Sequence, residues 1–305
     1  MALAERTEFL MFSRYLQLCQ AMVHFAAGRW GRVVGSAAYA AEGSPPIRSA
    51  ALTLIARLAA RRGDPAAHDL LAEAWPLALA TGEPQRIGPT AAAIAEAAVL
   101  AGDPERARDP VRTAATLAQQ HGTPAVRAEL GYWLHTLSPQ EADEPADDLL
   151  EREPYTMLRV GRWREAHQIW QAAGFRYEAA VALSRSDEVD DELRSLADLD
   201  DLGAEPMARA VRASLRLRGI AGVPRGPQPS TKDHPLGLTA RQSEVARLVA
   251  QGMTNAEIAA HLVVSVRTVD SHVAAVLAKA GVANRRGLVA RFVELGMTLD
   301  GDAAG

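Results

Sequence analysis

Apolar residues recur at helical spacing through most of the first 218 residues, in segments that glycine and proline separate. Glycine suits the left-handed cap that ends one helix, and proline suits the first turn of the next. Such stops stand at Gly43-Ser-Pro-Pro46, Gly63-Asp-Pro65, Gly82-Glu-Pro84, Gly102-Asp-Pro104 and Gly122-Thr-Pro124. The pattern predicts helices at about residues 8–27, 30–41, 47–62, 65–80, 84–101, 104–120, 124–136, 147–158, 163–173, 177–183, 188–201 and 205–218.

These helices follow one another with a period that is typical of helical repeats. About twelve helices in this region give one helix pair for roughly every 35 residues, the period of a tetratricopeptide-type solenoid. The tripeptide Gly-Asp-Pro occurs at 63–65 and again 39 residues later at 102–104. The tripeptide Gly-Arg-Trp occurs at 28–30 and at 161–163. Because the repeat is degenerate, an irregular α-helical bundle is the alternative. The sequence therefore predicts an all-α fold that begins with a tetratricopeptide-like (TPR-like) domain.

Glycine and proline become frequent between Gly219 and Gly237, and the apolar periodicity stops there. A stretch of this composition breaks helices and behaves as a linker with some extended, semi-rigid character. Helical periodicity resumes at Leu238. The sequence thus predicts a helical repeat domain at 1–218, a linker at 219–237 and a second helical domain at 238–299.

Four short helices with capping signals are expected in this second domain. Thr239 and Gln242 have the spacing of a capping box for the first helix, Asn255 can cap the second, and Ser265 can cap a third at 266–280. A fourth is expected at about 286–295. A short helix, a tight turn and a longer helix with a polar outer face form a helix-turn-helix. The side chains expected to face its core are Val245, Leu248, Val249, Ile258, Ala259, Leu262, Val269, Val273, Val276, Leu277, Ala280, Leu288, Val289 and Phe292.

A run of about 60 residues in this domain resembles the signature of LuxR-type helix-turn-helix domains, without gaps. The resemblance implies a four-helix domain that reads the major groove of double-stranded DNA and often dimerises through its last helix. A homodimer is therefore expected, at least on DNA. The matching positions are Leu238-Thr239, Arg241, Glu244-Val245, Gly252, Asn255, Glu257-Ile258-Ala259, Leu262, Ser265, Arg267-Thr268-Val269, His272-Val273, Lys279, Gly281-Val282 and Asn284-Arg285.

The resemblance also assigns positions that grip the DNA backbone. It implies that four side chains contact phosphates: Arg267, Thr268, Lys279 and Arg285. Contacts of this kind set the affinity and the register of a protein on DNA without reading its sequence.

Three further positions are implied to face base edges: Asp270, Ser271 and Ala274. Asp270 departs from the lysine that is common in the family at this position. A carboxylate cannot donate to guanine, but it can accept a hydrogen bond from the cytosine amino group. Asp270 therefore either alters the preferred DNA sequence or repels phosphate and weakens binding. We expect the neighbouring His272 to be a half-buried packing residue rather than a DNA contact.

The charge distribution supports a nucleic-acid partner for the second domain. Residues 1–217 hold 23 Lys and Arg against 30 Asp and Glu, whereas residues 236–299 hold seven against four. An acidic body that carries a small basic module is typical of a DNA-binding protein.

Patterns for other chemistry are missing from the sequence. The single Cys19 excludes an intrachain disulfide and a cysteine-based metal cage, and the eight histidines lack metal-ligand spacing. Neither Lys232 nor Lys279 belongs to a Gly-x-x-x-x-Gly-Lys-Ser/Thr phosphate loop. We therefore expect no enzyme activity, no cofactor and no ATPase module in this chain. The N-terminus lacks a signal-peptide core, and no stretch reaches the roughly 18 apolar residues of a membrane span. A cytoplasmic protein without a membrane partner is expected.

The favoured hypothesis is a transcriptional regulator that binds a protein or small-molecule effector through its helical domain. Segments 172–183 and 222–227 resemble the C-terminal portion of large ATP-binding LuxR-type regulators, here without the ATPase. The alternative is a protein-interaction scaffold with a weak or vestigial DNA-binding domain. The tryptophans are expected to be packing anchors, with the alternative that some line a ligand or peptide groove: Trp30, Trp75, Trp133, Trp163 and Trp170.

Overall fold

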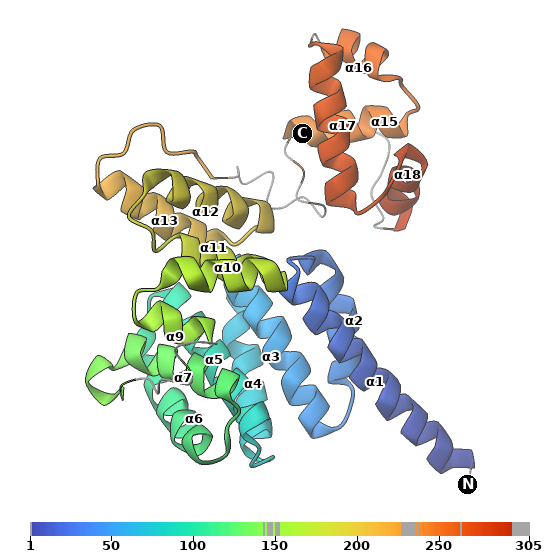
Figure 1. The fold of residues 1–305 in the computed structure, drawn as a ribbon. Coiled ribbons are helices and arrows are strands. Elements are labelled where there is room, and N and C mark those ends of the chain that lie inside the picture. The colour runs from blue at the N-terminus through green and yellow to red at the C-terminus, as the bar shows by residue number, and fades with distance from the viewer. Residues whose placement is uncertain are drawn as a thin grey trace. The chain divides into compact units, whose positions relative to one another are not determined.

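The computed structural model of the chain describes residues 2–142, 144, 149, 153–226, 236, 238, 240–262 and 264–294 (Figure 1). Every regular element in these residues is a helix. The chain divides into two compact units, Met1–Pro224 and Arg225–Gly305. The predicted all-α fold class is confirmed. The part of the first unit that the structure describes contains no strand.

Helix ends in the first unit agree with the predicted segments to within a few residues in most cases. Two helices agree at both ends, and the segment predicted at 104–120 instead begins with a separate 3₁₀ turn. Residues 147, 148 and 150–152 of the segment predicted at 147–158 lie outside the described residues. The α-helices are α1 (Ala2–Ala26), α2 (Val33–Ala41), α3 (Pro45–Arg62), α4 (Ala66–Leu79), α5 (Pro84–Ala101), α6 (Arg108–His121), α7 (Pro124–Leu137), α9 (Pro154–Arg159), α10 (Trp163–Ala173), α11 (Arg176–Leu183), α12 (Val189–Leu202) and α13 (Glu205–Leu217). Short 3₁₀ turns lie at Trp30–Arg32, Pro104–Ala107 and Pro139–Glu141.

The glycine stops work in two different ways. Gly63 and Gly102 end their helices with φ of 78° and 79°, in the left-handed region that the sequence predicted. Gly43 and Gly122 do not have positive φ, so the prediction of a left-handed cap was wrong there. A Cβ on Gly122 would lie 2.6 Å from the carbonyl oxygen of Ala118, so this position needs glycine because two backbone segments approach closely.

Successive helices of the first unit pack side by side, from α3 on α4 through to α12 on α13. Next-but-one helices also touch, as α3 does with α5 and α5 with α7, which is the contact pattern of stacked helix pairs. This arrangement is consistent with the TPR-like expectation. Figure 1 shows helices α3 to α9 grouped together, with α10 lying across them.

The two ends of this helical array share one hydrophobic core. Leu18 of α1 and Leu58 of α3 belong to the same buried cluster as Leu199 of α12 and Leu215 of α13. A Cβ on Gly28 would lie 2.5 Å from a methyl group of Leu202, which shows how closely the last helices approach the first. The array therefore returns on itself around a common interior, a feature that the sequence pattern did not predict.

The second unit contains α15 (Ala240–Ala250), α16 (Asn255–Leu262), α17 (Val266–Ala280) and α18 (Arg285–Glu294). The predicted core is confirmed for most positions, and Leu262, Leu277 and Val289 are partly buried at its edge. Residues 227–235 and 237 of the predicted linker lie outside the described residues, as do Thr239 and Leu295 at the ends of predicted helices. No described helix is long and apolar enough to cross a lipid bilayer.

Candidate nucleic-acid interface

The helix-turn-helix is formed by α16, which ends at Leu262, and by α17, which begins at Val266. The cap of α16 is Thr254 rather than the predicted Asn255. The Thr254 backbone N–H donates to the Glu257 carboxylate at 2.7 Å, and the Glu257 N–H donates to the Thr254 hydroxyl at 3.3 Å. This reciprocal pair is a capping box. The hydrogen bond from the Thr254 backbone N–H lowers the pKa of the Glu257 carboxyl, and the hydrogen bond from the Thr254 hydroxyl adds to this effect.

The predicted cap of α17 is confirmed. The Ser265 hydroxyl accepts a hydrogen bond from the Thr268 backbone N–H at 3.1 Å, and the two hydroxyl oxygens lie 2.8 Å apart. Gly281 ends the helix with φ of 68°. Val269, Val273 and Val276 bury the inner face of α17 against the domain core. These contacts hold the opposite face of α17 toward solvent.

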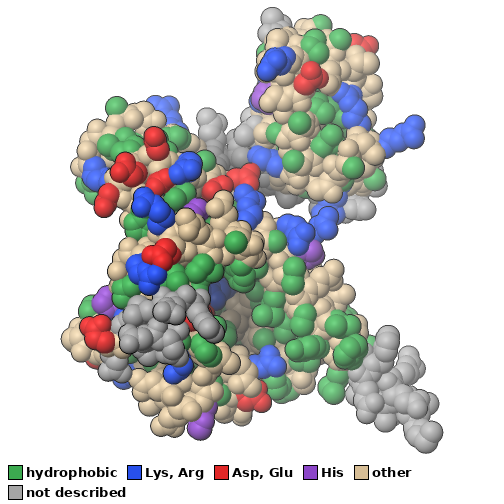
Figure 2. Space-filling view, in the orientation of Figure 1, with side chains coloured by type: hydrophobic (Ala, Val, Ile, Leu, Met, Phe, Trp, Pro, Cys, Tyr) green, Lys and Arg blue, Asp and Glu red, His purple; other side chains and the backbone are tan. Residues whose placement is uncertain are grey.

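Six of the seven predicted DNA contacts are exposed on or beside this outer face: Arg267, Thr268, Asp270, Ser271, Ala274 and Lys279. At 3.6 residues per turn, positions 267, 270, 271 and 274 share one face of the helix, and positions 268 and 279 lie together along one side of that face. The Lys279 ammonium donates to the Gln242 side chain of α15 at 2.9 Å. In the view of Figure 2, the second unit shows more Lys and Arg than Asp and Glu. His272 is half-buried, as expected for a packing residue.

Asp270 is joined to the rest of the domain through Asn255. Its carboxylate accepts a hydrogen bond from the Asn255 side-chain nitrogen at 2.5 Å. The Asn255 side-chain oxygen in turn accepts from the Arg285 guanidinium. Asp270 thus helps to fix α16 against α17, besides presenting an acceptor on the outer face.

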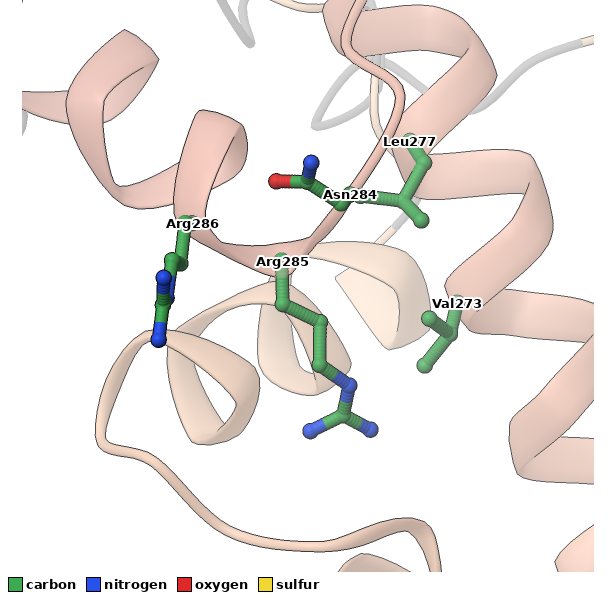
Figure 3. Close-up of a pocket in the computed structure, with 5 residues that line it drawn as sticks. All are labelled: Val273, Leu277, Asn284, Arg285 and Arg286. Atoms are coloured by element: carbon green, nitrogen blue, oxygen red, sulfur yellow. The ribbon is translucent and has the colours of Figure 1, made fainter.

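Arg285 is half-buried, and its guanidinium is engaged inside the domain. It donates to the Met253 carbonyl oxygen at 2.6 Å as well as to Asn255, so it ties the start of α18 to the turn before α16. A hollow beside it is lined by Val273 and Leu277 of α17 and by Asn284 and Arg286. Figure 3 shows the Arg285 and Arg286 side chains diverging, with Arg286 on the side away from Val273.

Two of these roles were missed from the sequence. Thr254-x-x-Glu257 has the spacing of a capping box, so this signal was available. The bridge that Asn255 makes between Asp270 and Arg285 had no local signal, because its members are 15 and 30 positions from Asn255. In the part of the chain that the structure describes, no group of histidine, cysteine, aspartate or glutamate side chains has the arrangement of a metal site.

Comparison with known proteins agrees with this geometry. Residues 236–292 match the family model described as bacterial regulatory proteins, luxR family. The response regulator Rre1 of Synechocystis sp. is 38% identical over 82 residues, which cover 27% of this chain and 36% of that relative. The chain thus aligns with little more than a third of the curated relative. No solved structure matched the chain. The second unit contains a LuxR-type helix-turn-helix domain.

Proposed function

We propose that this chain is a sequence-specific DNA-binding transcriptional regulator whose helix α17 lies in the major groove. The observation that carries the proposal is the exposed polar face of α17, which a buried apolar face and two defined caps hold outward. The LuxR-type match over residues 236–292 and the basic balance of this domain support it. A protein that works on genomic DNA in a bacterium is cytoplasmic, so a cytoplasmic location follows from the same proposal.

The proposed contacts divide into two groups. Arg267, Thr268, Lys279 and Arg285 are assigned to phosphates, and Asp270, Ser271 and Ala274 to base edges. Arg285 is the least available of these side chains, since two of its guanidinium nitrogens already donate within the domain. Its contribution to DNA binding is therefore proposed to be mainly through the position of α18.

A salt series of DNA-binding measurements tests the proposal. Affinity should fall steeply with salt, and Arg267→Ala or Lys279→Ala should weaken binding to all sequences. Each lost phosphate contact should reduce the slope of log K against log salt by about 0.9. Arg216→Ala is the matched control, because Arg216 is an exposed arginine of α13 in the first unit. We expect that variant to bind as the wild type does.

The alternative is a helical scaffold whose DNA-binding domain is vestigial. Absence of binding at low salt, or equal binding by the Arg267 and Lys279 variants, would favour the scaffold. The effector of the helical unit and the paired state on DNA are also proposals. Two copies are proposed because LuxR-type domains bind paired half-sites. No catalytic step is proposed for the chain, either as a regulator or as a scaffold.

A further inference from the structure

The first unit contains a partly open cavity of about 90 Å³ where helices from most of the array meet. Its lining comes from α3, α5, α7, α9, α10, α11 and α13, together with Arg185 just after α11. All of these helices lie within the first compact unit. Figure 1 shows three of them, α5, α7 and α9, next to one another. The cavity therefore belongs to the helical unit alone.

The lining concentrates the few aromatic residues of the chain. The sequence has five tyrosines and five tryptophans, and half of these ten side chains line the cavity: Tyr132, Trp133, Tyr155, Trp170 and Tyr177. Tyr132 and Tyr155 have ring centroids 5.5 Å apart, and Tyr155 meets Trp170 edge-on at 5.0 Å. In a core that is otherwise filled mainly by alanine and leucine, this concentration gives the cavity a largely aromatic lining.

One wall of the cavity carries buried charges. The Arg61 side chain is 1% exposed, and it donates to Glu96 and to Glu178 at 2.7 Å each. Its guanidinium also lies 3.8 Å from the centroid of the Tyr177 ring. A buried ion pair stabilises a fold poorly compared with apolar packing, because its charges lose their hydration. The charges of Arg61, Glu96 and Glu178 therefore suit ligand recognition as well as packing.

Three buried polar atoms on the cavity-lining residues have no hydrogen-bond partner among the described residues. They are Arg61 Nη1, Trp133 Nε1 and Glu178 Oε2. An unsatisfied buried donor or acceptor costs roughly 1–3 kcal/mol, so such atoms are uncommon without a ligand or solvent to meet them. These two donors and one acceptor are themselves covered, and all three belong to side chains that line the cavity.

We infer that this cavity binds a small planar heteroaromatic molecule that carries both a hydrogen-bond acceptor and an N–H donor. Aromatic walls accommodate a flat ring, Arg61 and Trp133 offer donors to a ring nitrogen or carbonyl, and Glu178 offers an acceptor to an amino group. The volume limits the buried part of the ligand to about one ring. The role of this molecule as the effector of a regulator rests on the proposed function, whereas its binding does not.

Adenine is a suitable probe, since it is flat and carries an amino donor beside ring-nitrogen acceptors. Titration of adenine into the full chain should quench tryptophan fluorescence saturably and raise the unfolding midpoint, because Trp133 and Trp170 line the cavity. Trp133→Phe removes the ring N–H, and Glu178→Gln places an amide donor where an acceptor stands. Each variant should weaken adenine binding at least tenfold.

Two controls make the result decisive. Trp75→Phe changes a tryptophan in a different cluster and should bind adenine as the wild type does. Indene, an apolar molecule of similar shape, should bind at least tenfold more weakly than adenine. Circular dichroism of each variant shows whether it is folded. No saturable adenine binding, equal binding of indene, or unchanged binding by folded Trp133→Phe and Glu178→Gln would overturn the inference. Loss of DNA binding alone would contradict only the proposed function.

Discussion

Asp270 is an exposed carboxylate on α17 that is also held from inside the domain. It accepts from Asn255 at 2.5 Å, so part of its hydrogen-bonding capacity is used before DNA arrives. Its second carboxylate oxygen can still accept from a cytosine amino group. Base reading and fixation of α16 are therefore compatible roles for one side chain.

Replacement of Asp270 by lysine should separate these roles. Lysine donates to guanine O6 and N7, so Asp270→Lys should shift the sequences selected from a random DNA pool toward guanine at one position of each half-site. Asn255→Ala is the control, because it removes the internal partner and leaves the carboxylate on the outer face. That variant should keep the wild-type preference. The same preference in Asp270→Lys as in the wild type would exclude Asp270 as a base reader.

Arg285 should contribute to the stability of the second unit more than to direct contact with DNA. Arg285→Ala leaves the Met253 carbonyl and Asn255 without their donor, and we expect it to cost about 1–3 kcal/mol in the second unit. Hydrogen exchange of α16 and α17 amides is the appropriate measurement, because all tyrosines and tryptophans precede residue 178. The exposed neighbour Arg286 gives the control, with an expected change within about 0.5 kcal/mol for Arg286→Ala. If the amide exchange rates in Arg285→Ala equal those of the wild type, Arg285 does not stabilise the second unit. Only its proposed phosphate contact would then remain.

Sequence reasoning predicted the exposed face of α17 correctly, because a single helix decides which of its faces is buried. The outward face of α17 follows from the spacing of Val269, Val273 and Val276, which bury the other side. The partners of Arg285 could not be predicted, because they depend on how the turn before α16 meets the start of α18. The phosphate role came from a resemblance, and resemblance does not report internal hydrogen bonds.

Helix ends were predictable for the same local reason, and helix neighbours were not. Gly102 and Pro104 mark the end of α5 and the turn that follows, and the structure has α5 end at Ala101. The packing of α12 and α13 on α1–α3 joins residues more than 150 positions apart, as Leu199 and Leu18 do. The apolar pattern shows that α12 must bury a face, but it does not identify the helix that covers it.

At the scale of elements, α1 carries an exposed apolar stripe that can pair two copies of the chain. Phe12, Leu16 and Val23 are 62%, 51% and 60% exposed, and with Cys19 they have the alternating four- and three-residue spacing of a coiled-coil seam. Figure 2 shows apolar side chains gathered over this side of the unit. A stripe of this spacing is self-complementary in a parallel helix pair.

A pair of this kind places the two Cys19 thiols close together. Mild oxidation should therefore cross-link the wild-type chain into a dimer, with Cys19→Ser as the negative control. Phe12→Glu should convert dimer to monomer in sedimentation, whereas Leu217→Glu, at an apolar side chain of α13 that is 89% exposed, should not. A monomer for the wild type both free and bound to a two-half-site DNA would contradict the proposed homodimer.

At the scale of the whole first unit, buried ion pairs connect distant parts of the array. Arg57 and Arg61 of α3 bind Glu96 of α5, and they reach Glu129 of α7 and Glu178 of α11 respectively. Arg61 and Glu178 are 117 positions apart. The network thus joins the beginning, middle and end of the helical array, so its protonation state should affect the unit as a whole.

Glu96 makes the stability of the first unit depend on acid. Burial by itself raises the pKa of Glu96, but Arg61 and Arg57 outweigh it and lower the pKa from 4.5 to about 2. A carboxyl whose pKa is lowered on folding contributes stability above its unfolded pKa, and this contribution is lost as the pH falls. We therefore expect the free energy of unfolding to decrease between about pH 4.5 and pH 2, by up to about 3 kcal/mol from this group.

Glu96→Gln tests the same network at neutral pH. The variant leaves two buried arginines short of a counter-charge, so we expect a loss of about 3–5 kcal/mol in denaturant unfolding followed by tryptophan fluorescence. Its remaining stability should fall less than that of the wild type below pH 4.5, because the titrating carboxyl is gone. Glu73→Gln is the matched control, since Glu73 pairs with Arg48 at the surface with 46% of its side chain exposed. That change should cost less than about 1 kcal/mol and leave the acid dependence as it is in the wild type. An acid profile for Glu96→Gln as steep as the wild-type profile would assign the acid sensitivity to other carboxyl groups.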